Sequence, residues 1–143
     1  MRHESKETPV LMFPSHIQTV NEPLGLTLII GSWNYPFGTI FPAFISAIAA
    51  GNPCIIKPSE KSPFSSQIVE KIVSQMDQRY FRCFQGAIET SVYLNKLKFD
   101  HIIFTGSSRT GKFIRNDAPI NTKVTLELGG VNHSVVDVGA NLE

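Results

Sequence analysis

Short apolar segments recur along the middle of the chain and are separated by longer stretches with a helical period. Residues 26–30 (Leu-Thr-Leu-Ile-Ile) and 54–57 (Cys-Ile-Ile-Lys) are apolar almost without interruption. Such a run is typical of a strand that is covered on both faces. Residues 82–85, 101–104 and 123–128 predict three further strands, and residues 135–136 the start of a sixth. The pattern therefore predicts a sheet of at least five strands.

Helical patterns fill the intervals between these strands. Residues 40–50 are an apolar helix that ends at Gly51 and Asn52, a suitable C-terminal stop. Ser65 or Ser66 can cap the next helix. The residues of that helix at positions i, i+1, i+4, i+5 and i+8 form one apolar stripe, which predicts its buried face: Ile68, Val69, Ile72, Val73 and Met76. Residues 90–97 predict a short helix whose inward residues are Val92, Tyr93 and Leu97.

The alternation of strands and helices predicts an α/β fold. It is Rossmann-like and doubly wound, with a mostly parallel five-stranded sheet and helices on both faces. We expect residues 1–21 to be an irregular segment and residues 22–130 to form a cofactor-binding domain.

Composition excludes several classes of function. The 143 residues suffice for one domain, and 13 basic residues balance 12 acidic ones. A net charge of +1 without a basic cluster gives no electrostatic basis for binding nucleic acid. The charge-free stretch between Glu22 and Lys57 is interrupted by Gly and Pro, so no membrane-spanning segment is predicted. Two cysteines without metal-ligand spacing predict no metal site and favour a reducing, cytoplasmic location.

Polar and glycine-containing segments follow four of the predicted strands, at residues 31–36, 57–60, 106–111 and 127–130. The carboxyl ends of parallel strands meet at one edge of a sheet, where open α/β sheets bind their ligands. We therefore expect these four segments to form one crevice, and we expect that crevice to hold a cofactor.

Each segment has a chemical interpretation and a structural alternative. Residues 106–111 (Gly-Ser-Ser-Arg-Thr-Gly) suit a phosphate at a helix N-terminus, or are an ordinary strand–helix turn. Lys57 and Glu60 suit ribose hydroxyls, or form a solvated turn in which Ser59 caps a helix. Asn34 either donates to a developing oxyanion or ties its turn. Glu127 is either a carboxylate whose cleft raises its pKa for base catalysis or a solvent-facing residue of an edge strand.

Neither cysteine has the placement of a nucleophile. Cys54 and Cys83 each lie within a predicted strand, whereas a reactive thiolate is favoured at a helix N-terminus or beside a cation. Both are interpreted as small core residues.

Together these segments resemble the aldehyde dehydrogenase superfamily, from residue 22 to the C-terminus. The similarity rests on the motifs Trp-Asn-Tyr-Pro, Ala-Ile-Ala-Ala-Gly-Asn, Lys-Pro-Ser-Glu, Phe-Asp-His-Ile, Phe-Thr-Gly-Ser and Leu-Glu-Leu-Gly-Gly. Within the superfamily the chain is most similar to the class 3, or fatty-aldehyde, branch. The resemblance implies oxidation of an aldehyde to a carboxylic acid with NAD⁺ or NADP⁺, in a homodimer or homotetramer. It also implies that residues 131–143 begin the transition to a catalytic domain that this chain does not contain, so that the predicted fold is incomplete.

The resemblance also implies roles for individual residues. Asn34 would help to form the oxyanion hole and Glu127 would be the general base. The cofactor-binding residues would be Gly31, Ser32, Trp33, Lys57, Ser59, Glu60, Gly86, Thr105, Gly106, Ser107, Thr110, Gly111, Leu128 and Gly129. NAD⁺ is favoured over NADP⁺, because the Glu60 carboxylate would repel a 2′-phosphate.

The sequence departs from the family pattern in its last third. In the family the nucleophilic cysteine lies well beyond Glu-Leu-Gly-Gly, whereas here 13 residues follow Gly130. Residues 131–133 (Val-Asn-His) replace the usual Lys and Ser/Asn-Pro, and residues 115–119 do not have a helical pattern. Two hypotheses follow. The chain is part of an aldehyde dehydrogenase and inactive alone, or it is a non-catalytic remnant that binds a nucleotide or a partner.

Overall fold

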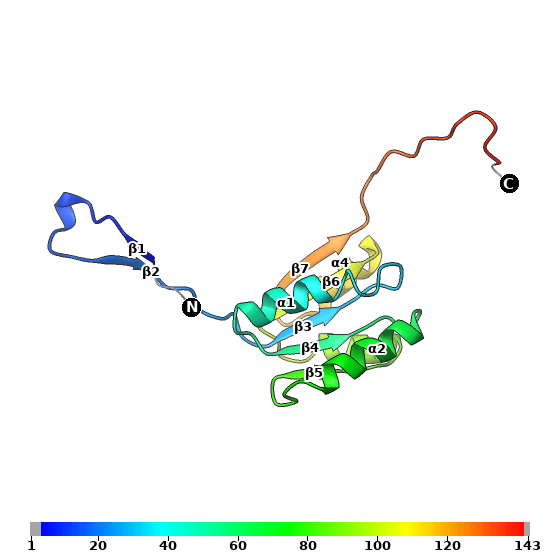
Figure 1. Cartoon of the computed structure of the whole chain (residues 1–143), viewed down its shortest axis with the longest axis horizontal. Coiled ribbons are helices and arrows are strands. Elements are labelled where there is room, and N and C mark those ends of the chain that lie inside the picture. Colours follow the sequence, from blue (N-terminus) through cyan, green and yellow to red (C-terminus); the bar gives the residue numbers. More distant parts are fainter. Residues whose placement is uncertain (1–3, 142–143) are drawn as a thin grey trace.

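The computed structural model describes residues 4–141 and contains a five-stranded parallel sheet (Figure 1). The strands are β3 (Thr27–Ile30), β4 (Cys54–Lys57), β5 (Phe81–Cys83), β6 (His101–Gly106) and β7 (Lys123–Leu128). Their spatial order is β5-β4-β3-β6-β7, and each strand is parallel to its neighbours. The predicted α/β fold and five-stranded sheet are confirmed.

Four helices cover the two faces of this sheet: α1 (Phe41–Ala49), α2 (Pro63–Ser74), α3 (Ile88–Asn95) and α4 (Ser108–Asp117). Successive side chains of a strand point to opposite faces. Ile29 of β3 packs with residues of α1 and α2, whereas its neighbours Leu28 and Ile30 pack with residues of α3 and α4. Two helices therefore lie on each face, as the doubly wound prediction requires.

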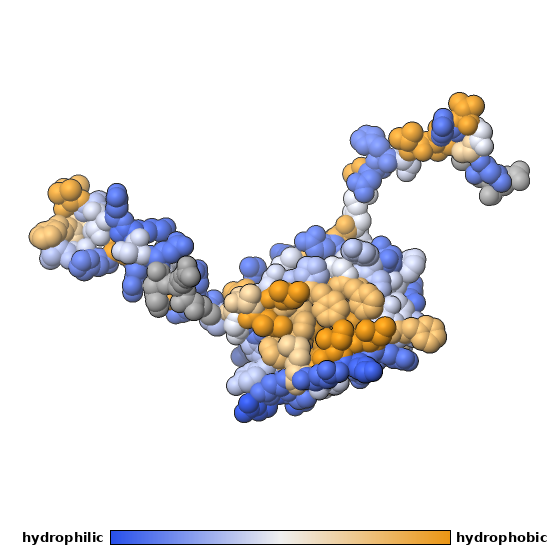
Figure 2. Space-filling model, in the orientation of Figure 1, coloured by the Kyte–Doolittle hydropathy of each residue, from blue (hydrophilic) through white to orange (hydrophobic). Residues whose placement is uncertain are grey.

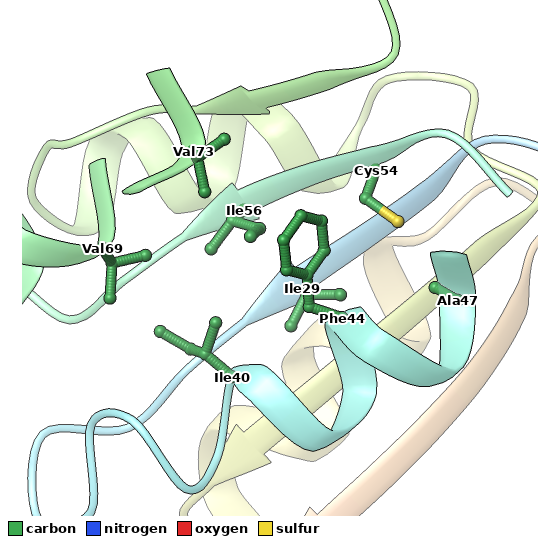
Figure 3. Packing of buried hydrophobic residues seen from close by; sticks show 8 residues of the cluster. All are labelled: Ile29, Ile40, Phe44, Ala47, Cys54, Ile56, Val69 and Val73. Carbon is green, nitrogen blue, oxygen red and sulfur yellow. The ribbon is translucent and has the colours of Figure 1, made fainter. Parts of the chain in front are cut away.

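The core on the α1 and α2 face consists of apolar side chains from strands β3 and β4 and from helices α1 and α2 with the N-cap of α1 (Figure 3). Ile29, Cys54 and Ile56 rise from the sheet, and Phe44 of α1 lies over them. The Phe44 ring meets the edge of Phe81 from β5, with 5.6 Å between the ring centroids. Burying an apolar side chain of this size stabilises a fold by about 1.5–3 kcal/mol.

Helix α2 differs from its prediction in two respects. Its N-cap is Ser62, ahead of Pro63, so neither Ser65 nor Ser66 caps it. Proline at the first position fixes a helical φ and lacks an N–H that would have no partner there. Val69 is fully buried, but Ile68 and Ile72 are 50% and 43% exposed. Within the predicted stripe, Val69 and Val73 pack against the sheet. Ile68 and Ile72 instead belong to an apolar surface over α1 and α2 (Figure 2).

The elements of the second half also differ in their bounds. Helix α3 begins two residues earlier than predicted, and its buried residues are Leu94 and Asn95, whereas Tyr93 and Leu97 are exposed. Strand β5 spans Phe81–Cys83, whereas the predicted strand was residues 82–85, so it begins one residue earlier and ends two residues earlier. Helix α4 continues through Asp117, so the expectation that residues 115–117 are not helical is wrong. Pro119 lies beyond the C-cap and removes no helical hydrogen bond.

The N-terminal segment is more regular than predicted. Strands β1 (Glu4–Lys6) and β2 (Ile17–Thr19) form an antiparallel hairpin, with a 3₁₀ turn, η1 (Val10–Met12), between them. Figure 1 shows this hairpin extending away from the sheet. At the other end, residues 131–141 form neither helix nor strand, so the predicted sixth strand is wrong. Within residues 4–141 no helix has the length and apolar character needed to cross a membrane.

Candidate cofactor and active site

A cleft of about 910 Å³ opens at the carboxyl ends of β3, β4, β6 and β7. Residues of all four polar segments line this cleft, as expected for segments that follow parallel strands of one sheet. Of the residues that the sequence singled out, these line the cleft: Gly31, Ser32, Trp33, Asn34, Lys57, Ser59, Glu60, Thr105, Gly106, Ser107, Thr110, Glu127, Leu128 and Gly129. Gly86 and Gly111 do not line it.

Lys57, at the end of β4, is buried, with 1% of its surface exposed. Its Nζ donates to the carbonyl oxygen of Pro58 at 2.9 Å and to Glu60 Oε2 at 3.0 Å. These acceptors compensate for the loss of hydration of a buried ammonium group. The interpretation of this segment as an ordinary solvated turn is therefore wrong for Lys57.

The Glu60 carboxylate is held in its charged form. Partial burial raises its pKa, but a hydrogen bond from its own backbone N–H, the hydrogen bond from Lys57 and the charges of Lys57 and Lys61 outweigh that effect. The net result is a pKa below the ordinary value for a glutamate. An ionised carboxylate only accepts hydrogen bonds, which suits it to ribose hydroxyl donors.

Ser59 stabilises the turn between Lys57 and α2, but it is not the cap of α2. Its Oγ accepts from the N–H of Lys61 at 3.3 Å. Its carbonyl oxygen accepts from the hydroxyls of Ser62 and Ser66, at 3.3 and 2.8 Å. The turn that carries Glu60 is thereby fixed to the first turn of α2.

Asn34 is exposed in the loop between β3 and α1. The hydroxyl of Ser32 donates to Asn34 Oδ1 at 2.8 Å, so the amide nitrogen of this cleft-lining residue remains as its donor. The backbone N–H of Ser32 donates to Thr39 Oγ1 at 3.2 Å, and this hydrogen bond joins the start of the loop to its end. Gly31 permits this path, because a Cβ there would lie 2.5 Å from Cγ1 of Ile40.

Helix α4 begins at the cleft with Ser107 as its N-cap. Ser107 Oγ accepts from the N–H of Thr110 at 3.2 Å. The first N–H groups of a helix lack intrahelical acceptors, and together with the helix dipole they favour an anion. The N-terminus of α4 is therefore the part of the cleft best suited to a phosphate.

The two glycines that lie outside the cleft serve the packing of the helices. A Cβ at Gly111 would lie 2.6 Å from Leu128 Cδ2, so this glycine lets α4 approach β7. Gly86 has a φ of +145°, and a Cβ there would collide with Thr90 Oγ1. Their expected contact with a cofactor is not supported by their placement.

Residues that the sequence analysis did not assign to the site also line the cleft. Ile88 and Val92 of α3 and Phe113 of α4 supply apolar surface, and Ile88 is 68% exposed. Lys61 and Arg109 add two cations. The sequence carries no signal for this apolar wall, because the exposure of Ile88 depends on tertiary packing and the predicted helix began after that residue.

A second groove of about 420 Å³ lies between α1 and the strands β6 and β7. Thr105 and Glu127, which are neighbours across β6 and β7, border both this groove and the cleft. Glu127 is exposed on an edge strand, which is the structural alternative that the sequence left open. Its position at the junction of two cavities is nevertheless one that a base could use.

Neither cysteine borders these cavities. Burial raises the pKa of Cys54 to about 11. Burial and the charge of Glu70 raise that of Cys83 to about 12, against a smaller lowering by Lys57. Both thiols are free and protonated at neutral pH, in agreement with their interpretation as structural residues. Among residues 4–141, no group of histidines, cysteines and carboxylates could hold a metal ion.

A sequence model described as the aldehyde dehydrogenase family matches residues 2–143. The chain belongs to the aldehyde dehydrogenase family. It is 43% identical over 140 residues to aldehyde dehydrogenase family 3 member A2 of Macaca fascicularis, an alignment that covers 96% of this chain and 28% of that protein. The class 3 resemblance is thereby confirmed. The chain spans less than a third of the length of this relative.

Solved structures of family members agree in fold. A substrate-bound state of Staphylococcus aureus AldH superposes with a TM-score of 0.87 at 40% identity, covering 90% of this chain and 29% of that one. Glyceraldehyde-3-phosphate dehydrogenase GapN of Methanocaldococcus jannaschii, complexed with NADP, superposes with a TM-score of 0.77 at 30% identity. That alignment covers 92% of this chain and 29% of the archaeal one.

Proposed function

We propose that this chain is the cofactor-binding part of an oxidoreductase that converts an aldehyde to a carboxylic acid with NAD⁺ or NADP⁺. The observation that carries the proposal is the single cleft in which Asn34, the Lys57–Glu60 pair, the N-terminus of α4 and Glu127 meet. Membership of the aldehyde dehydrogenase family supports the type of reaction.

The cleft fits a dinucleotide in size and in chemistry. Glu60 would accept from the adenosine ribose, with Lys57 fixing its carboxylate at 3.0 Å. Gly106 and Ser107 would approach the pyrophosphate at the N-terminus of α4. The apolar wall of Ile88, Val92 and Phe113 would contact the adenine. The nicotinamide of the cofactor supplies a hydride acceptor, and the protein positions it.

Two side chains of the cleft would assist the chemistry. The amide nitrogen of Asn34 would donate to the oxygen of the aldehyde as negative charge develops there. Glu127 would take a proton from the water that releases the acid product. Neither Cys54 nor Cys83 is assigned as the nucleophile, because neither borders the cleft and burial raises the pKa of both thiols. In this proposal a different cysteine of a complete enzyme forms the covalent intermediate.

The remaining properties follow from the same proposal. NAD⁺ is the preferred cofactor, because Glu60 favours ribose hydroxyls. The location is cytoplasmic, which is consistent with two free thiols. The enzyme is a homodimer or homotetramer. The extended hairpin of β1 and β2, with exposed Val10, Leu11 and Phe13 near its turn, supports association between subunits.

The proposal is tested by titrating the ¹⁵N-labelled chain with NAD⁺. We expect chemical-shift changes at Lys57, Glu60, Gly106 and Ser107, with weak affinity, because the chain spans only part of an enzyme of this family. Gly139, in the segment without helix or strand, is the internal reference and should not respond. Shifts that are absent, or that cluster away from the cleft, would contradict the proposal.

A second candidate function is a non-catalytic domain that binds a nucleotide. The placement of both cysteines outside the cleft favours it. Both functions predict that the purified chain binds NAD⁺ without forming NADH from a long-chain aldehyde, because neither Cys54 nor Cys83 borders the cleft. The two functions differ in the coding sequence that follows the codon for Glu143. An in-frame continuation that contains a cysteine would reject the non-catalytic role, whereas a stop codon there would reject the enzyme.

A further inference from the structure

The loop between β3 and α1 holds the main chain around Asn34 in place. The N–H of Ser32 donates to Thr39 Oγ1 at 3.2 Å, and the N–H of Thr39 donates to the carbonyl oxygen of Tyr35 at 3.0 Å. The Tyr35 ring lies where a Cβ of Gly38 would be, so the loop is also packed against itself. The main chain is therefore anchored on both sides of Asn34, and only the torsions of its side chain remain to be fixed.

One hydrogen bond sets the orientation of the Asn34 amide. The Ser32 hydroxyl donates to Asn34 Oδ1 at 2.8 Å, and both residues line the cleft. The oxygen and the nitrogen of an asparagine amide lie on opposite sides of Cγ, so an Oδ1 held beside Ser32 leaves Nδ2 on the other side. A reversed amide would offer oxygen lone pairs in place of N–H groups, and these would repel an oxyanion.

We propose that Ser32 is a positioning residue, which holds the Asn34 amide so that Nδ2 is the free donor to the oxygen of the substrate. The inference rests on the proposed function, in which that oxygen gains negative charge. Donors that are already oriented stabilise a developing charge most, because they need no reorganisation during the reaction. An amide that turns freely has to lose that freedom in the transition state.

The first measurement is the side-chain conformation of Asn34 in the ¹³C,¹⁵N-labelled chain. We expect three-bond couplings of a single χ1 rotamer in the unmodified chain, and couplings averaged over the staggered rotamers in Ser32→Ala. Ser32→Thr keeps the hydroxyl and should retain the single rotamer. Ser74→Ala is the matched control, because its exposed hydroxyl donates to the carbonyl oxygen of Lys71, outside the cleft.

The second measurement is the response of the Asn34 side-chain amide to acetate, the simplest carboxylate product, compared with chloride at equal ionic strength. We expect acetate to shift the N–H signals of this amide, and we expect Ser32→Ala to weaken the response about threefold. Ser32→Thr and Ser74→Ala should retain it. The side-chain amide of Asn132, in the segment without helix or strand, is the internal reference and should not respond.

An unchanged rotamer and acetate response in Ser32→Ala would overturn the role of Ser32. A strong nuclear Overhauser effect between the amide protons of Asn34 and Hβ of Ser32 would overturn it too, because Nδ2 rather than Oδ1 would then face the hydroxyl. An equal response to chloride would overturn the role of Asn34 as a donor to the substrate oxygen. Failure of NAD⁺ to shift the signals of Lys57 and Glu60 would instead reject the proposed cofactor site, on which the Asn34 measurements do not depend.

Discussion

The pair of Lys57 and Glu60 joins a fully buried cation to a partly exposed anion. The ammonium group has two acceptors within hydrogen-bonding distance, one of them a carbonyl oxygen of the main chain. Removing the carboxylate leaves the buried charge with one partner, whereas removing the ammonium group leaves a carboxylate that water can reach. The two deletions therefore have different costs.

We predict that Glu60→Ala lowers the free energy of unfolding by about 1–3 kcal/mol. Lys57→Met should change it by less than about 1 kcal/mol, because an apolar side chain of similar length fills the buried site. Urea denaturation of the two variants and the unmodified chain measures both values. A larger loss in Lys57→Met would show that the ion pair itself stabilises the fold.

The sequence predicted the chemical residues of the site better than its apolar ones. Lys57, Glu60 and Asn34 stand out because polar groups at or after the carboxyl ends of buried strands meet at one edge of a parallel sheet. Ile88 and Phe113 do not stand out, because an apolar side chain on a helix is read as core. Their exposure depends on how far α3 and α4 are separated, which only tertiary structure decides.

At the scale of elements, the strands were predictable and the faces of the helices were not. A fully covered strand such as Thr27–Ile30 is apolar throughout, so its pattern needs no knowledge of its neighbours. Helix α2 has two adjacent lines of apolar residues, and only packing decides that Val69 rather than Ile68 meets the sheet. Helix α4 continues through residues of low helix propensity and ends at Asp117, two residues before Pro119.

The turn that leads from β5 into α3 depends on a glycine. Gly86→Ala should destabilise the fold by about 1–3 kcal/mol, because φ is +145° there and the new Cβ would collide with Thr90. Gly129→Ala is the matched control, since no atom lies within 4 Å of its Cβ position. Thermal melting of both variants checks the prediction. Equal melting temperatures would show that the turn accommodates a side chain.

Strands β6 and β7 are linked by a histidine on the α1 side of the sheet. His101 Nε2 lies 2.8 Å from Thr125 Oγ1. Burial lowers the pKa of His101, and the nearby charge of Lys123 lowers it further. A histidine whose pKa is lower in the folded than in the unfolded chain stabilises the fold above its unfolded pKa, and this contribution is lost as the pH falls.

We predict that the melting temperature falls as the pH is lowered from about 7 to about 5, across the ordinary pKa of a histidine. His101→Gln should flatten this dependence, because its amide does not titrate. A His16→Gln variant in the N-terminal hairpin is the control and should retain the full dependence. A pH profile that His101→Gln leaves unchanged would assign the effect to other groups.

At the scale of the whole molecule, apolar surface is left uncovered. Figure 2 shows a continuous apolar area over α1 and α2, to which exposed Ile45, Phe64, Ile68 and Ile72 contribute. Isolated apolar residues are normal on a protein surface, but a contiguous area of this kind favours association.

We therefore predict that the purified chain self-associates as its concentration rises. Light scattering should show an average mass above 15.9 kDa at high concentration. Replacing Ile68 and Ile72 by Lys should reduce the association, and Lys71→Gln, on the same helix, should not. A single species of 15.9 kDa at every concentration would contradict the prediction.

The strand order has a consequence for how the chain is made. Central strand β3 pairs with β4 on one side and, through Thr27 and His101, with β6 on the other. A ribosome releases the β3–α1–β4–α2 half first, with its own buried cluster. The second edge of β3 stays unpaired until β6 has been synthesised, because His101 follows its partner Thr27 by 74 residues. We expect this edge to be the part of the nascent chain that most needs a chaperone.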